Sequence, residues 1–416
     1  MAEIIVHPSR GLTGELTLPG DKSLSHRAVM FSAIAEGATE ITGFLTAADT
    51  LNTLTAVQKL GVSVEGAGTA RLLVHGRGLD GLVEPDGVLD LGNSGTGMRL
   101  LAGLLAGQNF FSVLTGDQYL LTRPMARIVE PLRSMHAVID GRSGGRFAPL
   151  AIRGGGKGLK ALDYTTPVAS AQIKSALLLC GLYAEGETSV TEPHRSRDHT
   201  ERMLRFFGAE VREEGLTVSV RGRGHLKSAG TIAIPSDISS AAFFMVAAAI
   251  VPGSDILIRN VGVNPTRTGV IDILKEMGAD ITMEHPREQA GEPAADIRVK
   301  HRGLTAVTIA GEAIPRAIDD IPVISVAAAY AKGKTIIRDA AELRVKESDR
   351  LATMAAELTK MGAAVQERRD GMEITGRDTL EGARCESHGD HRVAMAMAVA
   401  GLAARGETVI QDTDWI

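Results

Sequence analysis

Lysine and arginine recur at positions where the sequence predicts that helices begin. Lys22 and Arg27 follow a turn in PGDKSLSHR, immediately before the apolar run AVMFSAIA. A helix N-terminus carries about half a positive charge, so a cation there is mildly repelled unless an anion binds nearby. The pattern recurs at Arg99, Arg123, Arg195, Arg197, Arg267, Lys346, Arg350 and Arg392. Together these residues predict a site for a ligand with several negative charges.

Two carboxylates lie among these cations and are candidates for proton transfer. Asp319 opens an apolar helix in RAIDDIPVI, and Glu347 lies between Lys346 and Arg350. Carboxylates beside cations stay ionised and can act as general bases. Each also has a purely structural interpretation, because Asp319 can cap its helix and Glu347 can pair with Arg350. The residues alone leave both interpretations open.

Motifs of several other catalytic sites are not found. The spacing of GDKS does not fit the phosphate-binding pattern GxxxxGK[ST], and GGGKG lacks the hydroxyl residue. No HExxH or paired CxxC signals a metal site, so we expect no metal and no organic cofactor. GNSGT departs from the nucleophile elbow GxSxG at its last residue, which argues against a serine hydrolase.

An internal repeat predicts the elements that position these residues. Six runs rich in Ala, Leu and Met each reach a glycine and continue into a stretch typical of a β-strand. We expect these glycines to be the C′ residues that end six helices, and they are Gly37, Gly107, Gly186, Gly253, Gly333 and Gly406. The runs are apolar nearly all round, which predicts central, buried helices.

Five amphipathic helices, such as ERMLRFFG and VIDILKEMG, alternate with these runs. We predict two domains of three repeats each, with residues 1–20 plus 230–416 in domain I and 21–229 in domain II. The active site is expected in the cleft between them. A sixth amphipathic helix would begin at DTDWI, so we expect that the natural protein continues for one more helix or that the given sequence lacks it.

Composition excludes several classes of protein. The chain has 416 residues, 44% of them hydrophobic, with a net charge of −5 and 3% aromatic residues. This balance argues against a nucleic-acid partner, and no apolar run reaches the roughly 18 residues of a membrane span. Two cysteines cannot build a disulfide framework. We therefore expect a cytoplasmic protein with no nucleic-acid or membrane partner. We also expect a monomer.

Eight motifs in order along the chain resemble the EPSP synthase family of enolpyruvyl transferases, and its bacterial class II in particular. They are PGDKSLSHRA, LGNSGTGMRLL, RPM, SAQIKSALL, RDHTERM, NPTRTG, RVKESDRL and GDHRVAMA. The resemblance implies a two-domain inside-out α/β barrel built from six repeated β/α units, three per domain. It also implies transfer of the enolpyruvyl group of phosphoenolpyruvate to the 5-hydroxyl of shikimate 3-phosphate, with release of phosphate, in the shikimate pathway of aromatic amino-acid biosynthesis.

The resemblance also implies roles for individual residues. The shikimate 3-phosphate ligands would be Lys22, Ser23, Arg27, Ser170, Ala171, Gln172, Arg197, Asp319 and Lys346. The phosphoenolpyruvate ligands would be Lys22, Gly95, Arg123, Gln172, Arg350 and Arg392. Asp319 is the expected base at the 5-hydroxyl, and Glu347 is expected to handle a proton at the methylene carbon. The division of proton transfer between Asp319, Glu347 and Lys22 stays open.

Two alternatives remain. The sister enolpyruvyl transferase that acts on UDP-N-acetylglucosamine shares the fold, but it needs a reactive loop cysteine that TGDQYLLTRPMARI lacks. A non-catalytic anion-binding protein could use the same basic residues. The pairing of Asp319 with Glu347 argues for chemistry, because an anion receptor gains nothing from carboxylates that face phosphate.

Overall fold

The computed structural model describes residues 2–228 and 230–414, and the chain divides into two compact units. Unit 1 comprises Met1–Leu18, Ser236–Arg287 and Pro293–Ile416, and unit 2 comprises Pro19–Pro235 and Glu288–Glu292. The predicted boundaries place residues 19–20, 230–235 and 288–292 in the other domain. They lie in unit 2 because β14 (Thr231–Ala233) pairs with β3 (Glu36–Thr42), and because Glu292 forms a buried ion pair with His199.

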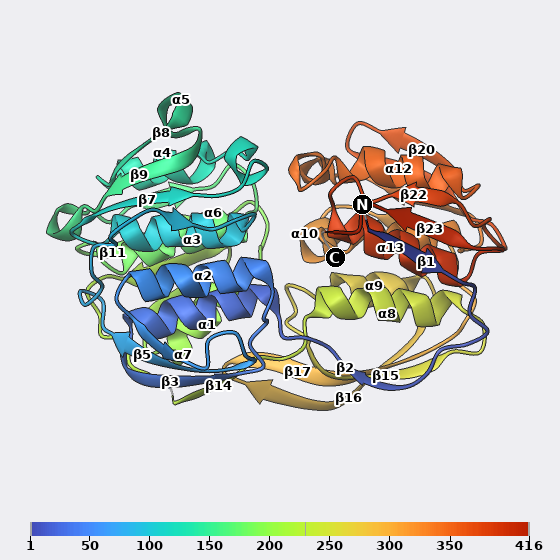
Figure 1. The fold of residues 1–416 in the computed structure, drawn as a ribbon, viewed down its shortest axis with the longest axis horizontal. Coiled ribbons are helices and arrows are strands. Elements are labelled where there is room, and N and C mark those ends of the chain that lie inside the picture. Colours follow the sequence, from blue (N-terminus) through green and yellow to red (C-terminus); the bar gives the residue numbers. More distant parts are fainter. Residues whose placement is uncertain (1, 229, 415–416) are drawn as a thin grey trace. The chain divides into compact units, whose positions relative to one another are not determined.

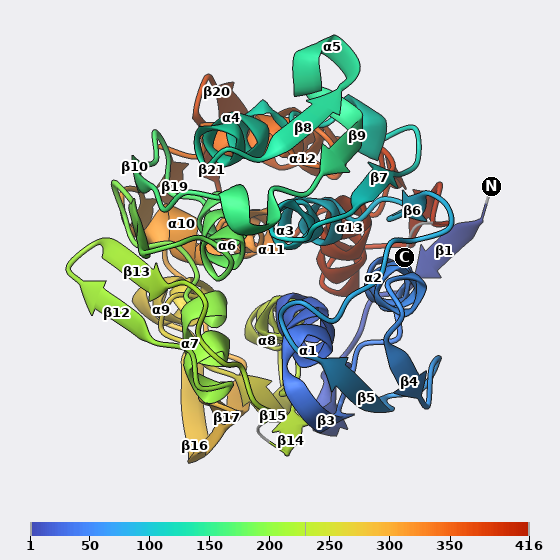
Figure 2. The ribbon, with the colours of Figure 1, turned by 90° about the vertical axis from the view of Figure 1, so that its left-hand side faces the viewer.

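Three four-stranded sheets of the same design surround the core of unit 2, as Figure 2 shows. In each sheet the first two strands are parallel and the other neighbours are antiparallel, in the orders β14-β3-β5-β4, β6-β7-β9-β8 and β10-β11-β13-β12. The remaining strands are β4 (Ser63–Glu65), β5 (Arg71–Arg77), β6 (Leu89–Asp90), β7 (Phe111–Thr115), β8 (Val138–Gly141), β9 (Phe147–Arg153), β10 (Asp163–Thr165), β11 (Glu187–Thr191), β12 (Val211–Glu214) and β13 (Thr217–Arg221).

The helices of unit 2, labelled in Figure 1, divide by burial into an inner set and an amphipathic set. The inner helices are α1 (Lys22–Ile34), α3 (Gly95–Ala106) and α6 (Ala171–Gly181), and nearly all of their residues are buried. The amphipathic ones are α2 (Ala48–Lys59), α4 (Ala126–Ser134) and α7 (His199–Phe206). Short turns complete the unit: α5 (Arg142–Gly145), η1 (Leu120–Thr122) and η2 (Gly156–Gly158).

Gly103 lets two inner helices approach closely. A Cβ built on Gly103 of α3 would lie 2.2 Å from the carbonyl oxygen of Ala176 in α6. Only a residue without a side chain fits there, so the pairing of α3 with α6 depends on this glycine.

Unit 1 repeats the design with its own hydrophobic core. Its inner helices are α8 (Ile238–Ile250), α11 (Ile321–Ala329) and α13 (His391–Leu402), and its other helical segments are α9 (Gly269–Glu276), α10 (Ala313–Ala317), η3 (Ala341–Val345) and α12 (Arg350–Lys360). Its sheets have the orders β16-β17-β15-β2, β18-β19-β21-β20 and β1-β23-β22. The strands are β1 (Glu3–Val6), β2 (Thr13–Thr17), β15 (Asp255–Gly262), β16 (Asp280–Gln289), β17 (Glu292–Lys300), β18 (Thr308–Ile309), β19 (Lys334–Ile337), β20 (Ala364–Arg368), β21 (Gly371–Thr375), β22 (Arg384–Glu386) and β23 (Thr408–Gln411).

The N-terminal strands belong to sheets of the C-terminal half. β2 lies parallel to β15, and β1 lies antiparallel to β23. β1 thus occupies the place that a hairpin strand has in the other sheets. The predicted fold class, an inside-out α/β architecture with apolar helices inside and sheets outside, is confirmed.

The predicted role of the repeat glycines is wrong in detail. Gly107 is the C-cap of α3 with a φ of −76°, which any residue can adopt. Gly37, with a φ of +97°, lies within β3 and follows the C-cap Ala35 of α1. At Gly37 the pattern therefore marks the turn into the strand, where left-handed φ favours glycine, and at Gly107 it marks the C-cap, one position before the predicted C′.

Two further sequence predictions concern membrane-spanning helices and an additional helix at the C-terminus. No helix among the described residues combines the length and the apolar character needed to cross a membrane. The expected sixth amphipathic helix would begin in DTDWI, of which residues 415 and 416 lie outside the described part of the chain.

Candidate active site

In unit 2 the starts of the three inner helices are cross-linked to one another. His26 of α1 contacts the Thr53 hydroxyl at 2.8 Å and the Ser94 hydroxyl, at the start of α3, at 3.4 Å. Arg99 of α3 donates to the Gln172 side-chain oxygen of α6 over 2.6 Å. Gathering three helix starts concentrates backbone N–H groups and partial positive charge, which suits an anion.

We call Lys22, Ser23, Gly95, Arg123, Ser170 and Gln172, at or beside these helix starts, the unit-2 cluster. Lys22 lies 3.2 Å from a carboxylate oxygen of Asp49 in the first turn of α2. The Gln172 amide donates to the Thr96 hydroxyl over 3.0 Å. A Cβ on Gly95 would lie 3.0 Å from Arg99 Nη1 and 3.1 Å from Arg123 Nη1. The bare backbone of Gly95 therefore lies against two guanidinium groups.

Arg27 differs from the rest because it is buried among protein groups. Its guanidinium donates to the Thr200 hydroxyl over 2.8 Å, to the Ser175 hydroxyl over 2.9 Å and to the Ser23 carbonyl oxygen over 3.0 Å. Burial lowers the pKa of Arg27 to about 10, which still leaves the group charged near neutral pH. The contacts brace α1 against α6 and α7, and direct binding of substrate by Arg27 stays a prediction.

Ser170 and Arg197 come from different segments of unit 2 that share a buried anchor. Ser170 is the N-cap of α6, with its hydroxyl accepting from the Ile173 N–H, and Ala171 is the first residue of that helix. The Ser170 N–H donates to Glu192, and the N–H of Ser196, the neighbour of Arg197, donates to the same carboxylate. Arg195, by contrast, forms an exposed ion pair with Glu213 at 3.4 Å.

In unit 1 the predicted acids lie among the predicted cations, and we call Asp319, Lys346, Glu347, Arg350 and Arg392 the unit-1 cluster. Asp319 Oδ1 lies 3.4 Å from Lys346 Nζ and 3.5 Å from Arg350 Nη1. Glu347 accepts from Arg350 over 2.7 Å. The side chains of Asp319 and Glu347 are 17% and 24% exposed. Both carboxylates are therefore reachable by a ligand.

The two structural interpretations of these carboxylates have different outcomes. Asp320, not Asp319, is the N-cap of α11, so helix capping does not account for Asp319. Glu347 does pair with Arg350, so that interpretation describes a real contact. At other inner helices the N-cap side chain does accept a hydrogen bond from a backbone N–H of the first turn. These N-cap residues are Asp21, Ser94, Asp237 and Asp390.

Arg350 and Arg392 form hydrogen bonds that link the helix starts of unit 1 to one another. Arg350 is 1% exposed and donates to Asp390, the N-cap of α13, over 2.8 Å. Burial opposes its charge, but Glu347 and Asp390 outweigh this effect and raise the pKa of Arg350. Arg392 donates to the Asp319 carbonyl oxygen over 2.9 Å. The Asp319 backbone is therefore fixed by one cation, while its side chain faces two others.

Sequence reasoning left out several residues of these networks. Arg99 is one of the cations predicted at helix starts, but its contact with Gln172, like that of Asp390 with Arg350, joins positions far apart in the chain. Asp49 and Glu192 carry no signal of their own in the sequence. Asp320 is buried, and burial raises its pKa. Only the fold reveals these partners.

The buried imidazole of His26 predicts an acid-dependent loss of stability. Burial lowers the pKa of His26 from 6.5 to about 3. Between these values the unfolded chain binds a proton that the folded chain does not, so stability falls as pH falls. We expect the burial of neutral His26 to lower the free energy of unfolding by about 1.5 kcal/mol between pH 6.5 and pH 5. Urea unfolding at both pH values should show this loss in the wild type and a correspondingly smaller one in His26→Gln. An equal loss in both proteins would contradict the prediction.

Comparisons with known proteins agree on one family. The family model described as EPSP synthase (3-phosphoshikimate 1-carboxyvinyltransferase) matches residues 6–416. The chain is 57% identical over 416 residues to a 3-phosphoshikimate 1-carboxyvinyltransferase of Citrifermentans bemidjiense, covering 100% of this chain and 96% of that one. The enzyme of the same name from Geobacter metallireducens is 56% identical, with the same coverage. The solved EPSP synthase of Acinetobacter baumannii superposes with a TM-score of 0.89 at 50% identity, covering 99% of this chain and 94% of that one. The chain belongs to the EPSP synthase family.

Proposed function

We propose that this chain transfers the enolpyruvyl group of phosphoenolpyruvate to the 5-hydroxyl of shikimate 3-phosphate and releases phosphate. Membership of the EPSP synthase family supports the reaction. The observation on the molecule that carries it is Asp319, a partly exposed carboxylate held among Lys346 and Arg350. A base placed among cations suits a reaction that deprotonates a hydroxyl next to anionic groups.

The residues proposed to bind the two substrates come mainly from the unit-2 cluster and the unit-1 cluster. Shikimate 3-phosphate is assigned to Lys22, Ser23, Arg27, Ser170, Ala171, Gln172, Arg197, Asp319 and Lys346, and phosphoenolpyruvate to Lys22, Gly95, Arg123, Gln172, Arg350 and Arg392. The unit-2 cluster supplies helix starts and cations, and the unit-1 cluster adds the acids. Both clusters are proposed to act on the same pair of substrates.

The proposed chemistry has two steps. In the first, Asp319 takes the proton of the 5-hydroxyl as its oxygen bonds to C2 of phosphoenolpyruvate, while C3 gains a proton to become a methyl group. In the second, C3 loses a proton, the double bond forms again and the C2–O bond to phosphate breaks. Glu347 is proposed to handle the proton at C3, and the cations stabilise the charge on the departing phosphate. Lys22 is proposed as a further participant in proton transfer.

Phosphate release is the direct test of this function. The purified protein should release phosphate from phosphoenolpyruvate only when shikimate 3-phosphate is present. Phosphate release with UDP-N-acetylglucosamine in its place would assign the sister reaction. If no phosphate is released with either acceptor, the remaining assignment is a non-catalytic anion-binding protein. We also propose that the chain acts as a monomer in the cytoplasm, and sedimentation would test the first of these points.

A methyl group at Gly95 should weaken phosphoenolpyruvate binding selectively. In Gly95→Ala the added Cβ would crowd the guanidinium groups of Arg99 and Arg123, which lie within 3.1 Å. We expect the KM for phosphoenolpyruvate to rise by about tenfold, and that for shikimate 3-phosphate to change less. Gly224→Ala is the matched control, since its Cβ would meet no atom within 4 Å. Equal KM values for phosphoenolpyruvate in the wild type and Gly95→Ala would contradict the assignment.

A further inference from the structure

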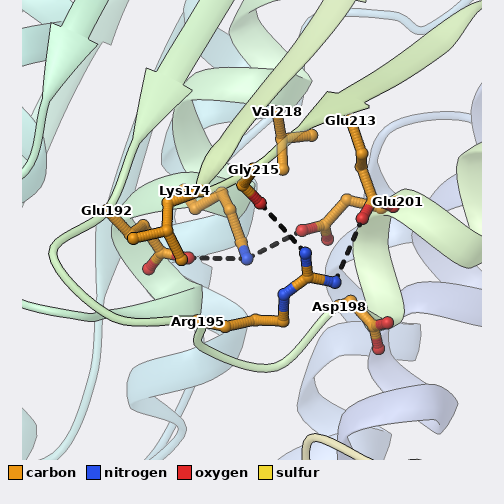
Figure 3. Close-up of a pocket in the computed structure, with 9 residues that line it drawn as sticks. Lys174, Glu192, Arg195, Asp198, Glu201, Glu213, Gly215 and Val218 are labelled. Atoms are coloured by element: carbon orange, nitrogen blue, oxygen red, sulfur yellow. Dashed lines mark hydrogen bonds and ion pairs between the residues drawn. The ribbon is translucent and has the colours of Figure 1, made fainter.

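A buried ion cluster contacts the unit-2 cluster through Ser170 and is not explained by the proposed chemistry. Lys174 of α6 lies 2.8 Å from Glu192 and 2.7 Å from Glu201 of α7, with the three side chains at most 2% exposed. Figure 3 shows Lys174 between the two carboxylates, beside a pocket that Arg195 and Glu213 also line. Burial opposes the charge of Lys174, but the two carboxylates outweigh it and raise its pKa.

The two carboxylates differ in what else they hold. Glu192 Oε1 accepts from the Ser170 N–H over 2.9 Å. Its Oε2 accepts from the Ser196 hydroxyl over 2.8 Å and from the Ser196 N–H over 3.3 Å. For Glu201 the interaction with Lys174 is the ion pair that the structure gives, with no hydrogen bond to either segment among the described residues.

We propose that Glu192 is a positioning residue that sets the spacing of the shikimate 3-phosphate ligands Ser170 and Arg197. One carboxylate joins the N-cap of α6 to the residue before Arg197, two segments that approach the site separately. Lys174 pairs with the same carboxylate at 2.8 Å. Each contact uses Glu192 as an acceptor, so the anchor needs both of its oxygens. The inference rests on the proposed function.

The replacement Glu192→Gln removes one acceptor with almost no change in volume. Whichever way the amide turns, an NH₂ group faces either the Ser170 N–H or the donors Lys174 and Ser196. Losing a buried hydrogen bond to a charged group should weaken shikimate 3-phosphate binding by about tenfold or more. The KM for phosphoenolpyruvate should change by less than about threefold, since its proposed ligands bond to other groups.

Glu201→Gln is the matched control because it changes a second carboxylate on the same lysine. It replaces an equally buried carboxylate by an amide of almost the same volume, but it leaves the Ser170 and Ser196 contacts intact. We expect its affinity for shikimate 3-phosphate to stay within about twofold of the wild type. Calorimetric titration with shikimate 3-phosphate alone measures this affinity without turnover, and KM values for both substrates complete the comparison.

Several outcomes would overturn the inference. If Glu192→Gln and Glu201→Gln weaken the binding of shikimate 3-phosphate equally, only the pairing of Lys174 with carboxylates matters and the contacts of Glu192 with Ser170 and Ser196 do not. Lower thermal stability of Glu192→Gln with unchanged affinity would reduce Glu192 to a structural role. If Glu192→Gln does not fold, Glu192→Asp keeps the charge but is too short to hold both segments, and unchanged affinity there would also overturn it. A wild type that neither binds shikimate 3-phosphate nor releases phosphate would instead overturn the proposed function.

Discussion

Replacing Asp319 by asparagine should lower kcat for phosphate release by about a hundredfold to ten-thousandfold, the range that general-base catalysis contributes. The amide keeps the volume of the carboxylate but cannot accept a proton from the 5-hydroxyl. The Asp319 carbonyl oxygen would still accept from Arg392, because that contact does not involve the side chain. The helix start should therefore keep its place while the chemistry is lost.

Binding separates this result from simple misfolding. Titration calorimetry with shikimate 3-phosphate should still show binding to Asp319→Asn, weakened by no more than the loss of one ligand. Asp272→Asn is a matched control in the same unit, since Asp272 on α9 also pairs with an arginine, Arg316. It should retain wild-type kcat. Near-normal turnover by Asp319→Asn would assign the base to another group, with Glu347 and Lys22 the next candidates.

The elements that carry the site could be predicted from sequence because their signals are local. An apolar run preceded by Ser, Asn or Asp identifies an inner helix, and Ser94, Ser170 and Asp390 do cap the helices that follow them. A cation within the first turns, as at Lys22 and Arg392, then points to an anion. Neither inference needs to know which other helices lie nearby.

The partners of those residues could not be predicted because they are set by the fold. Arg99 bonds to a side chain 73 positions away, and His199 to one 93 positions away. Glu192 has no sequence feature that separates it from an ordinary strand-end glutamate. The inner-helix glycines were misplaced for a related reason: a turn into a strand and a helix C-terminus both favour glycine, and the pattern does not distinguish them.

Removing the Arg350 guanidinium should destabilise unit 1 by about 3–5 kcal/mol and abolish phosphate release. Arg350→Gln removes the guanidinium that pairs with Asp390, whose side chain is 0% exposed, and it also removes the ion pair between Glu347 and Arg350. Burial disfavours the Asp390 carboxylate, yet Arg350 outweighs this effect and lowers its pKa. Without Arg350 a buried negative charge remains unpaired, which costs far more than an exposed ion pair contributes.

An exposed arginine of the same unit gives the control for this stability effect. Arg384 pairs with Glu3 at 2.9 Å, with side chains 64% and 40% exposed, so Arg384→Gln should cost less than about 1 kcal/mol. Calorimetry of thermal unfolding measures the stability of Arg350→Gln and of Arg384→Gln. Adding Asp390→Asn to Arg350→Gln should recover part of the stability, because it removes the unpaired charge, but none of the activity. Activity returning together with stability would mean that Arg350 serves the fold alone, whereas stability recovered without activity would assign it to the phosphoenolpyruvate site as well.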